Sequence, residues 1–346
     1  MNDSHFRAFG LTDVGRRRSD NQDHFLIAEL RKSMRVHATS LPVKQEASVY
    51  GGGKGLLLAV ADGMGGHAAG EHASSLAMDH LISQLLNSVH WFLQVDHDCE
   101  DNFVESLRDL LREAHARILA ESADNATRRG MGTTLTMGHI VWPRLYVVHA
   151  GDSRCYLIRD GKCQQLTTDH TLARQLVEAG GLRPEEEASS RWSNVLWNVL
   201  GGNGDGELIA EVTRTDLVSG DTVLLCSDGL SRYLDEATIG RVVTDLDGDV
   251  KAICYRLVEI ANAAGGEDNI TVVVSQPGIE TLGNEVNATT EREVDLHGLI
   301  GVDEPSAAVA SSEFMEDLGD GLNGLSDAAM RRLGDAETLP ENDEAH

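Results

Sequence analysis

Five aspartates of this chain lie next to short apolar segments, where strands would begin or end: Asp23, Asp62, Asp152, Asp228 and Asp268. One aspartate after a strand is usually a turn residue or a helix cap. Five are harder to explain in that way, because carboxylates that project from the ends of strands in one sheet converge. Converging carboxylates repel each other and raise each other's pKa values unless a positive charge neutralises them.

The residues beside these aspartates favour a hard divalent cation as that positive charge. Mg²⁺ and Mn²⁺ take carboxylate, carbonyl and water ligands. Glycines follow Asp62 and Asp228, and a glycine lets a backbone carbonyl approach an ion or makes a turn that a Cβ would block. The sequence has no cluster of cysteine and histidine at the spacing of a zinc site. We therefore expect a magnesium or manganese site.

Short aliphatic and β-branched segments predict the strands that would present these aspartates. They cover residues 56–61, 133–140, 145–150, 154–159, 222–227 and 270–275. Apolar residues three and four apart predict helices over 103–122 and 249–263, with Asp249 as an N-cap, and an alanine-rich helix over 71–86. The strands come in runs with helices between the runs, which predicts an α+β fold.

Charge and composition exclude several classes of function. Acidic residues number 56 against 29 basic residues, and the formal net charge is −27, which disfavours binding to nucleic acid or to an anionic membrane. No apolar run is long enough to span a bilayer, and the first residues do not resemble a signal peptide. The five cysteines include no CxxC pair, so we expect no disulfide framework and a cytoplasmic location.

The acidic charge is concentrated near the end of the chain. Residues 278–346 carry 17 acidic and 3 basic residues and one aromatic residue, Phe314. We predict a folded domain over residues 1–277 and an acidic, largely disordered tail over 278–346. Within the domain we predict a polar loop over 31–55 and a mobile surface lobe, or flap, over about 180–206.

Short motifs follow one another in a fixed order along residues 7–275. They are Thr12-Asp13-Val14-Gly15 with Arg18, Asn21-Gln22-Asp23, Asp62-Gly63-Met64-Gly65-Gly66, Gly132-Thr133-Thr134, Gly151-Asp152-Ser153-Arg154, Asp169-His170, Ser227-Asp228-Gly229-Leu230 and Asp268-Asn269. This ordered set resembles the metal-dependent protein phosphatases, the type 2C serine/threonine phosphatases, in their compact bacterial form. The resemblance implies a four-layer αββα sandwich, in which two antiparallel sheets are flanked by helices.

The resemblance also implies a site with two Mn²⁺ or Mg²⁺ ions and a possible third. Asp62 would bridge the two ions, the carbonyl of Gly63 would contribute, and Asp228 and Asp268 would bind the second ion. Asp23 would hold metal-bound water, Asn269 would support the site, and Asp152 would bind the third ion. Arg18 is the candidate phosphate clamp, because a guanidinium group matches phosphate oxygens in a bidentate way.

By this resemblance the chain is a serine/threonine protein phosphatase. It would hydrolyse phosphomonoesters with a hydroxide that bridges the two metal ions. Its partners would be phosphoserine and phosphothreonine proteins and a cognate serine/threonine kinase system, and we expect a monomer.

Two alternatives remain open at this point. One is a regulatory pseudophosphatase, a module that binds phosphoproteins without turnover, and the other is a phosphatase for a small molecule or for a partner in a signalling switch. Two positions depart from the resemblance: Gln22 stands where many members carry glutamate, and Met64 stands where some carry histidine.

Overall fold

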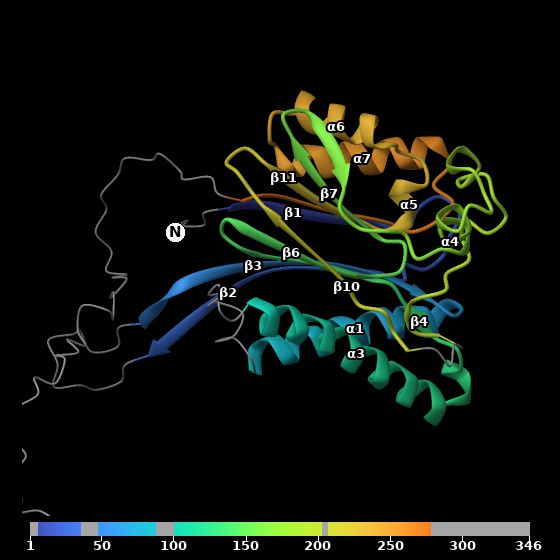
Figure 1. The fold of residues 1–346 in the computed structure, drawn as a ribbon, viewed down its shortest axis with the longest axis horizontal. Helices are drawn as coiled ribbons and strands as arrows, with labels where there is room; N and C mark the ends of the chain where they lie inside the picture. The colour runs from blue at the N-terminus through green and yellow to red at the C-terminus, as the bar shows by residue number, and fades with distance from the viewer. Residues whose placement is uncertain (1–5, 36–47, 88–99, 203–206, 278–346) are drawn as a thin grey trace, which may run out of the picture. The chain divides into compact units, whose positions relative to one another are not determined.

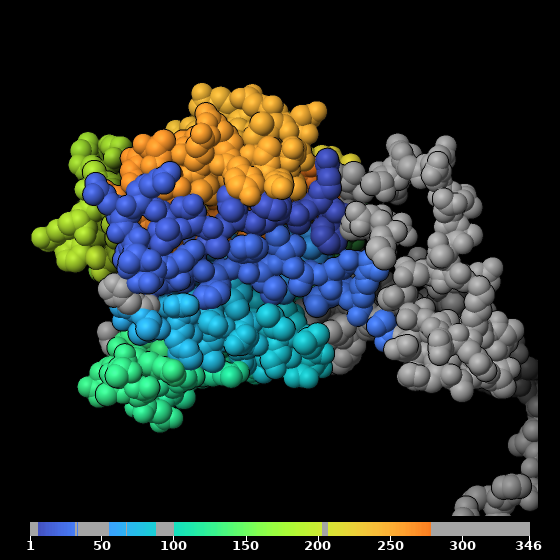
Figure 2. Space-filling model, turned by 180° about the vertical axis from the view of Figure 1, so that it is seen from behind, coloured from blue at the N-terminus to red at the C-terminus, as the bar shows by residue number. Residues whose placement is uncertain are grey.

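The computed structural model describes residues 6–35, 48–87, 100–202 and 207–277 (Figure 1). These residues form two antiparallel sheets that lie face to face, with helices on both outer faces. Figure 2 shows the same layers from behind, with the orange helices on one side of the blue strands and the cyan and green helices on the other. The four-layer αββα sandwich is therefore confirmed. The predicted acidic tail over 278–346 lies outside the described residues.

The first sheet has the strand order β1-β12-β11-β7-β8. Its strands are β1 (Phe6–Asp13), β12 (Ile270–Pro277), β11 (Thr222–Cys226), β7 (Arg154–Arg159) and β8 (Lys162–Gln165). Asp160 and Gly161 connect β7 to β8 with φ angles of 50° and 74°. An Asp-Gly pair suits such a turn, because both central residues need positive φ.

The second sheet has the order β10-β6-β5-β3-β4-β9, with β2 paired to β3. Its strands are β2 (Asp23–Arg35), β3 (Ser48–Met64), β4 (Gly132–Thr133), β5 (Leu135–Val141), β6 (Arg144–Ala150), β9 (Leu200–Gly201) and β10 (Glu211–Asp216). The predicted loop over 31–55 is wrong at both of its ends, where β2 and β3 continue as a paired hairpin beyond a register shift after Arg31. Antiparallel pairing satisfies the backbone of this polar segment, which side-chain composition alone does not reveal.

The helices cover the outer faces of the two sheets. Helices α1 (His67–Asn87) and α3 (Glu100–Asp124) pack on the second sheet, and α6 (Glu236–Asp245) and α7 (Val250–Ala264) pack on the first (Figure 1). The side chain of Asp249 accepts hydrogen bonds from the backbone of Lys251 and Ala252, which confirms the predicted N-cap. The short helices are α4 (Leu172–Glu178), α5 (Asp228–Ser231), η1 (Ala126–Arg128) and η2 (Pro184–Glu186).

Strand β3 shows why its apolar run is continuous. Leu56, Leu58 and Val60 face the other sheet, whereas Leu57 and Ala59 face the helices. A strand buried on both faces needs apolar residues at every position, so the alternating pattern of a half-buried strand is absent. Within the described residues, no helix has the length and apolar character that crossing a membrane requires.

Helix α5 begins at Asp228 and lies against β12 at a distance that only glycine permits. A Cβ added to Gly229 would come within 1.9 Å of the backbone oxygen of Asn269. This close approach brings the start of α5 beside the residues that precede β12. Glycine at 229 is therefore a condition for placing Asp228 next to Asp268.

We predict that Gly229→Ala lowers the free energy of unfolding of the metal-free protein by about 1–3 kcal/mol, because the added methyl group forces the backbone of α5 away from β12. Gly181→Ala is the matched control, because its Cβ would meet neighbours only at 3.5 Å or more. Urea denaturation of both variants measures the difference. Equal stability of Gly229→Ala and wild type would contradict the close approach.

Candidate active site

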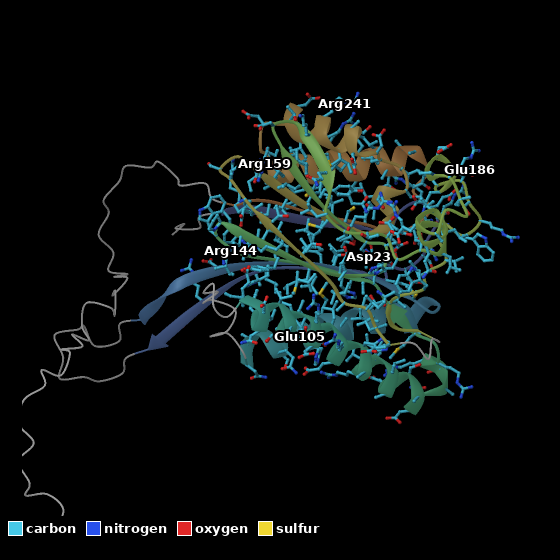
Figure 3. All side chains as sticks on the ribbon, viewed as in Figure 1. Asp23, Glu105, Arg144, Arg159, Glu186 and Arg241 are labelled. Carbon is cyan, nitrogen blue, oxygen red and sulfur yellow. The ribbon has the colours of Figure 1, made fainter. Side chains whose placement is uncertain are left out.

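A cleft of about 840 Å³ lies at one end of the sandwich. Figure 3 shows Asp23 between the two sheets near this end, toward α4 and α5. The cleft is lined by four of the five predicted aspartates, while Asp23 lies buried beside it with 4% of its surface exposed. The other lining residues that matter for charge or shape are Arg17, Arg18, Gln22, Gly63, Met64, Asn194, Val195, Leu196 and Arg232.

The aspartates come from both sheets, not from one. Asp62 lies near the end of β3 and pairs directly with Asp23 at the start of β2, and Asp152 follows β6 of the same sheet. Asp228 follows β11, and Asp268 precedes β12, in the other sheet. The expectation that the carboxylates converge is confirmed, but the premise of one shared sheet is wrong: they converge because the ends of two stacked sheets meet.

Burial raises the pKa values of this cluster. The pKa of Asp23 is raised to about 7, mainly by burial, although Ser227 Oγ and Thr271 Oγ1 each donate a hydrogen bond to its Oδ2 at 2.7 Å. Burial followed by repulsion from Asp23 and Asp228 raises the pKa of Asp62 well above its ordinary value. Burial and the charge of Asp228 raise that of Asp152 in the same way. Folding therefore places carboxylates where their charged forms are strongly disfavoured.

Two carboxylate oxygens of the cluster have no hydrogen-bond partner among the described residues: Oδ1 of Asp23 and Oδ1 of Asp228. A buried oxygen without a donor is costly in free energy. A divalent cation that prefers oxygen ligands would offset the repulsion, and the cation together with its waters would satisfy these atoms. The residues present therefore fit such an ion, with Asp62, Asp152, Asp228 and Asp268 as the carboxylates that could hold it.

Gly63 occupies a position that excludes any side chain. A Cβ there would lie 2.1 Å from the backbone oxygen of Gly70 in α1. Its backbone N–H donates to the carbonyl of Gln22 at 3.2 Å, which joins the end of β3 to the residues before β2. Gly63 thus lies in the cleft beside Asp62, where the sequence predicted it.

Asn269 lies beneath the cleft and fixes the loop that carries Arg18. Its Nδ2 donates to the carbonyls of Val14 and Asp20 at 3.0 and 2.9 Å, and its Oδ1 accepts from the backbone N–H of Gln22 at 2.9 Å. These bonds tie residues 14–22 to the start of β12. Asn269 therefore anchors the loop that carries Arg18.

Two arginines lie among the carboxylates. Arg18 is half exposed, and its Nη2 donates to Asp268 Oδ2 at 2.7 Å. Arg232 is ion-paired with Asp228, and sequence reasoning missed it. The signal was present, because Arg232 follows Asp228 by four residues and such a pair meets on one face of a helix. This spacing indicates an ion pair only when a helix is known to start at Asp228.

We predict that Asp23→Asn raises the melting temperature of the metal-free protein at pH 8 by on the order of 5 °C. The folded pKa of Asp23, about 7, lies above the ordinary value of 3.8, so ionisation of this group opposes folding as pH rises through this interval. The gain should therefore be largest above pH 7 and shrink toward pH 4. Thermal unfolding at several pH values measures it.

Asp20→Asn is the control for this experiment, because it removes a carboxylate that also lines the cleft but is exposed. It should give no comparable pH-dependent gain. An Asp23→Asn variant less stable than wild type at pH 8 would show that the buried carboxylate is not disfavoured.

Comparison with known proteins agrees with this geometry. A family model described as protein phosphatase 2C matches residues 43–271. The chain is 37% identical over 249 residues to the serine/threonine protein phosphatase PstP of Mycobacterium tuberculosis, covering 71% of this chain and 45% of PstP, so it spans about half the length of that relative. It is 34% identical to the protein phosphatase PhpP of Streptococcus pneumoniae, covering 76% of this chain and 94% of PhpP.

A solved structure shows the same fold. The catalytic domain of PstP in complex with two manganese ions superimposes with a TM-score of 0.59 and 32% identity, covering 78% of this chain and 97% of that one. The family model and PhpP each match well over half of this chain, and the aspartates identified from the sequence meet in its cleft. The chain therefore belongs to the protein phosphatase 2C family.

Proposed function

We propose that this chain is a metal-dependent serine/threonine protein phosphatase that hydrolyses phosphomonoesters. The observation that carries the proposal is the cluster of buried carboxylates with raised pKa values and two unpartnered oxygens, in a cleft that also contains arginines. The relative PstP, which is named a serine/threonine protein phosphatase, and the relative PhpP, which is named a protein phosphatase, support the substrate class. In the described residues, no feature favours a module that binds phosphoproteins without turnover, since each predicted aspartate stands at the cleft.

Two Mn²⁺ or Mg²⁺ ions would be held by Asp62, the carbonyl of Gly63, Asp228 and Asp268, and Asp152 would hold a third. Such ions, when bound, would neutralise part of the phosphate charge and lower the pKa of water, so that hydroxide is available as a nucleophile near neutral pH. The two manganese ions of the PstP catalytic domain support a site with two divalent ions.

The chain's own residues orient the reactants. Asp23 is held by Ser227 and Thr271 and keeps one oxygen free to fix a water molecule. Arg18 would hold the phosphate, because its half-exposed guanidinium lies in the cleft and can turn from Asp268 to a phosphate oxygen once cations neutralise that carboxylate. Asn269 limits the motion of the loop from which Arg18 extends.

We further propose that the protein acts as a cytoplasmic monomer on phosphoserine and phosphothreonine proteins, opposite a cognate kinase system. The cleft, which is lined in part by residues 194–196 of the flap, has room for a phosphorylated side chain presented by a peptide.

We predict that hydrolysis of p-nitrophenyl phosphate requires Mn²⁺ or Mg²⁺, stops in EDTA, and falls by more than roughly 100-fold in Asp228→Asn. Changes one shell outside a metal ion already cost about 10–100-fold, so loss of a direct ligand should cost at least as much. Asp245→Asn, an exposed aspartate on α6, is the control and should keep full activity. Metal-independent turnover, or a fully active Asp228→Asn, would contradict the proposal.

Arg18→Ala should raise KM for p-nitrophenyl phosphate by about 10-fold with a smaller change in kcat, because the lost contact is to the phosphate. The assay needs saturating Mn²⁺, since removing Arg18 also frees Asp268 and alters metal affinity. Steady-state kinetics separate the two constants. An unchanged KM would remove Arg18 from phosphate binding.

A further inference from the structure

A second cluster of titratable side chains lies next to the cleft: His149, His170 and Glu211, with possible ligand atoms within 4.8 Å of one another. A cavity of about 310 Å³ adjoins it. Two histidines and a glutamate are a donor set that zinc sites use. The hydrogen bonds of the two imidazoles decide whether the cluster can serve in that way.

His170 has its proton on Nε2. Its Nδ1 faces two donors, the backbone N–H of Gly151 at 3.1 Å and the Nδ2 of Asn198 at 2.9 Å. The amide of Asn198 is fixed in this orientation, because its Oδ1 accepts from the backbone N–H of Ile209 and its Nδ2 also donates to the carbonyl of that residue. Nδ1 must therefore accept, and the protonated Nε2 faces Glu211 Oε2 at 3.5 Å.

His149 follows the same rule. Its Nε2 lies 3.1 Å from the carbonyl oxygen of Thr168, which can only accept, and its Nδ1 lies 2.8 Å from Thr136 Oγ1. Burial lowers the pKa of His149 to about 4, which keeps the ring neutral with its proton on Nε2. In both rings Nδ1 faces a protein partner at hydrogen-bond distance and Nε2 faces an acceptor oxygen, so the cluster is a hydrogen-bonded assembly.

The assembly joins three parts of the molecule through His170. Its ring and its backbone N–H both bind Gly151, the residue before Asp152. Its carbonyl accepts from the backbone N–H of Trp197, and the edge of the Trp197 ring meets the imidazole at a centroid distance of 5.2 Å. Glu211, on β10, faces Nε2 at 3.5 Å. The loop of Asp152 and the segment that ends the 194–196 wall of the cleft thus share one anchor.

We propose that His170 is a positioning residue: its neutral imidazole, oriented by Glu211, holds the Asp152 loop and the neighbouring flap wall in the geometry that the cleft needs. Gly151 has a φ of 117°, and a Cβ there would lie 2.5 Å from Thr134. Contact with Thr134 therefore limits the movement of this loop on one side, and the hydrogen bonds from His170 limit it on the other. The part of this inference that concerns Asp152 rests on the proposed function. The part that concerns the tautomer of His170 is independent of it.

The first test reads the tautomer directly in the metal-free full chain. Long-range ¹H–¹⁵N correlation spectra of histidine-labelled protein, assigned by comparison with His170→Asn, should show His170 with a bare Nδ1 and a protonated Nε2. Addition of Zn²⁺ should leave that proton in place. A proton on Nδ1, or loss of the Nε2 proton on binding Zn²⁺, would overturn the proposal, whatever the enzymatic activity of the chain.

The second test separates positioning from packing. His170→Leu keeps much of the volume but removes the acceptor, whereas His170→Asn places an oxygen near the position of Nδ1. We expect His170→Leu to weaken the weakest Mn²⁺ site resolved by calorimetry about 10-fold, with His170→Asn close to wild type. Equal effects of the two variants, or no effect of either on Mn²⁺ affinity, would reduce His170 to a packing role and overturn the proposal.

His80→Leu is the matched control, because His80 is equally buried and lies 3.5 Å from Glu113, on helices away from the cleft. It should leave Mn²⁺ affinity unchanged. Glu211→Gln keeps the shape of the side chain and tests the same assembly if His170→Leu does not fold. We expect it to lower the affinity of the same Mn²⁺ site by less than His170→Leu does. An unchanged isotherm for Glu211→Gln would show that the glutamate does not orient His170.

Discussion

The burial of several carboxylates close to one another is the constraint on which the rest of this structure depends. The ends of two stacked sheets bring five aspartates to one cleft and its floor, and burial disfavours the charged form of most of them. Arg18 and Arg232 offset part of this charge through ion pairs with Asp268 and Asp228. The oxygens that remain unpartnered mark where a further positive charge is needed. The folded chain therefore holds carboxylates in an arrangement whose electrostatic free energy is unfavourable until a cation binds.

Apolar layers and close backbone packing stabilise the fold and offset the free energy lost by burying these carboxylates. Three apolar layers, one between the sheets and one under each pair of helices, hold the strands whose ends carry the aspartates. Glycine at 63 and 229 lets α1 and α5 approach the strands closely enough to place Asp62 and Asp228. Asn269 and His170 then secure the two loops of the cleft by hydrogen bonds to backbone groups.

The sequence was most informative where local chemistry and position coincide. The aspartates beside apolar runs, the helices with apolar spacing and the cap at Asp249 could be predicted, since each depends on neighbours in the chain. The stacking of two sheets was implied only by the resemblance to a known family. The hairpin beyond Arg31 and the ion pair of Arg232 could not be predicted, because they depend on contacts that the local pattern does not reveal. His170 illustrates the limit: its motif was recognised, but its tautomer follows only from Asn198 and Gly151 across the fold.

The measurement that tests the central claim most directly is calorimetric titration of the metal-free chain with Mn²⁺ near pH 7 in two buffers of different ionisation enthalpy. Because burial raises the pKa values of Asp23, Asp62 and Asp152, we expect Mn²⁺ binding to be saturable and to release protons. Asp62→Asn should weaken this binding and reduce the proton release. Absence of saturable binding by the folded chain, or binding with no proton release, would contradict the claim that buried, mutually repelling carboxylates create the cation site.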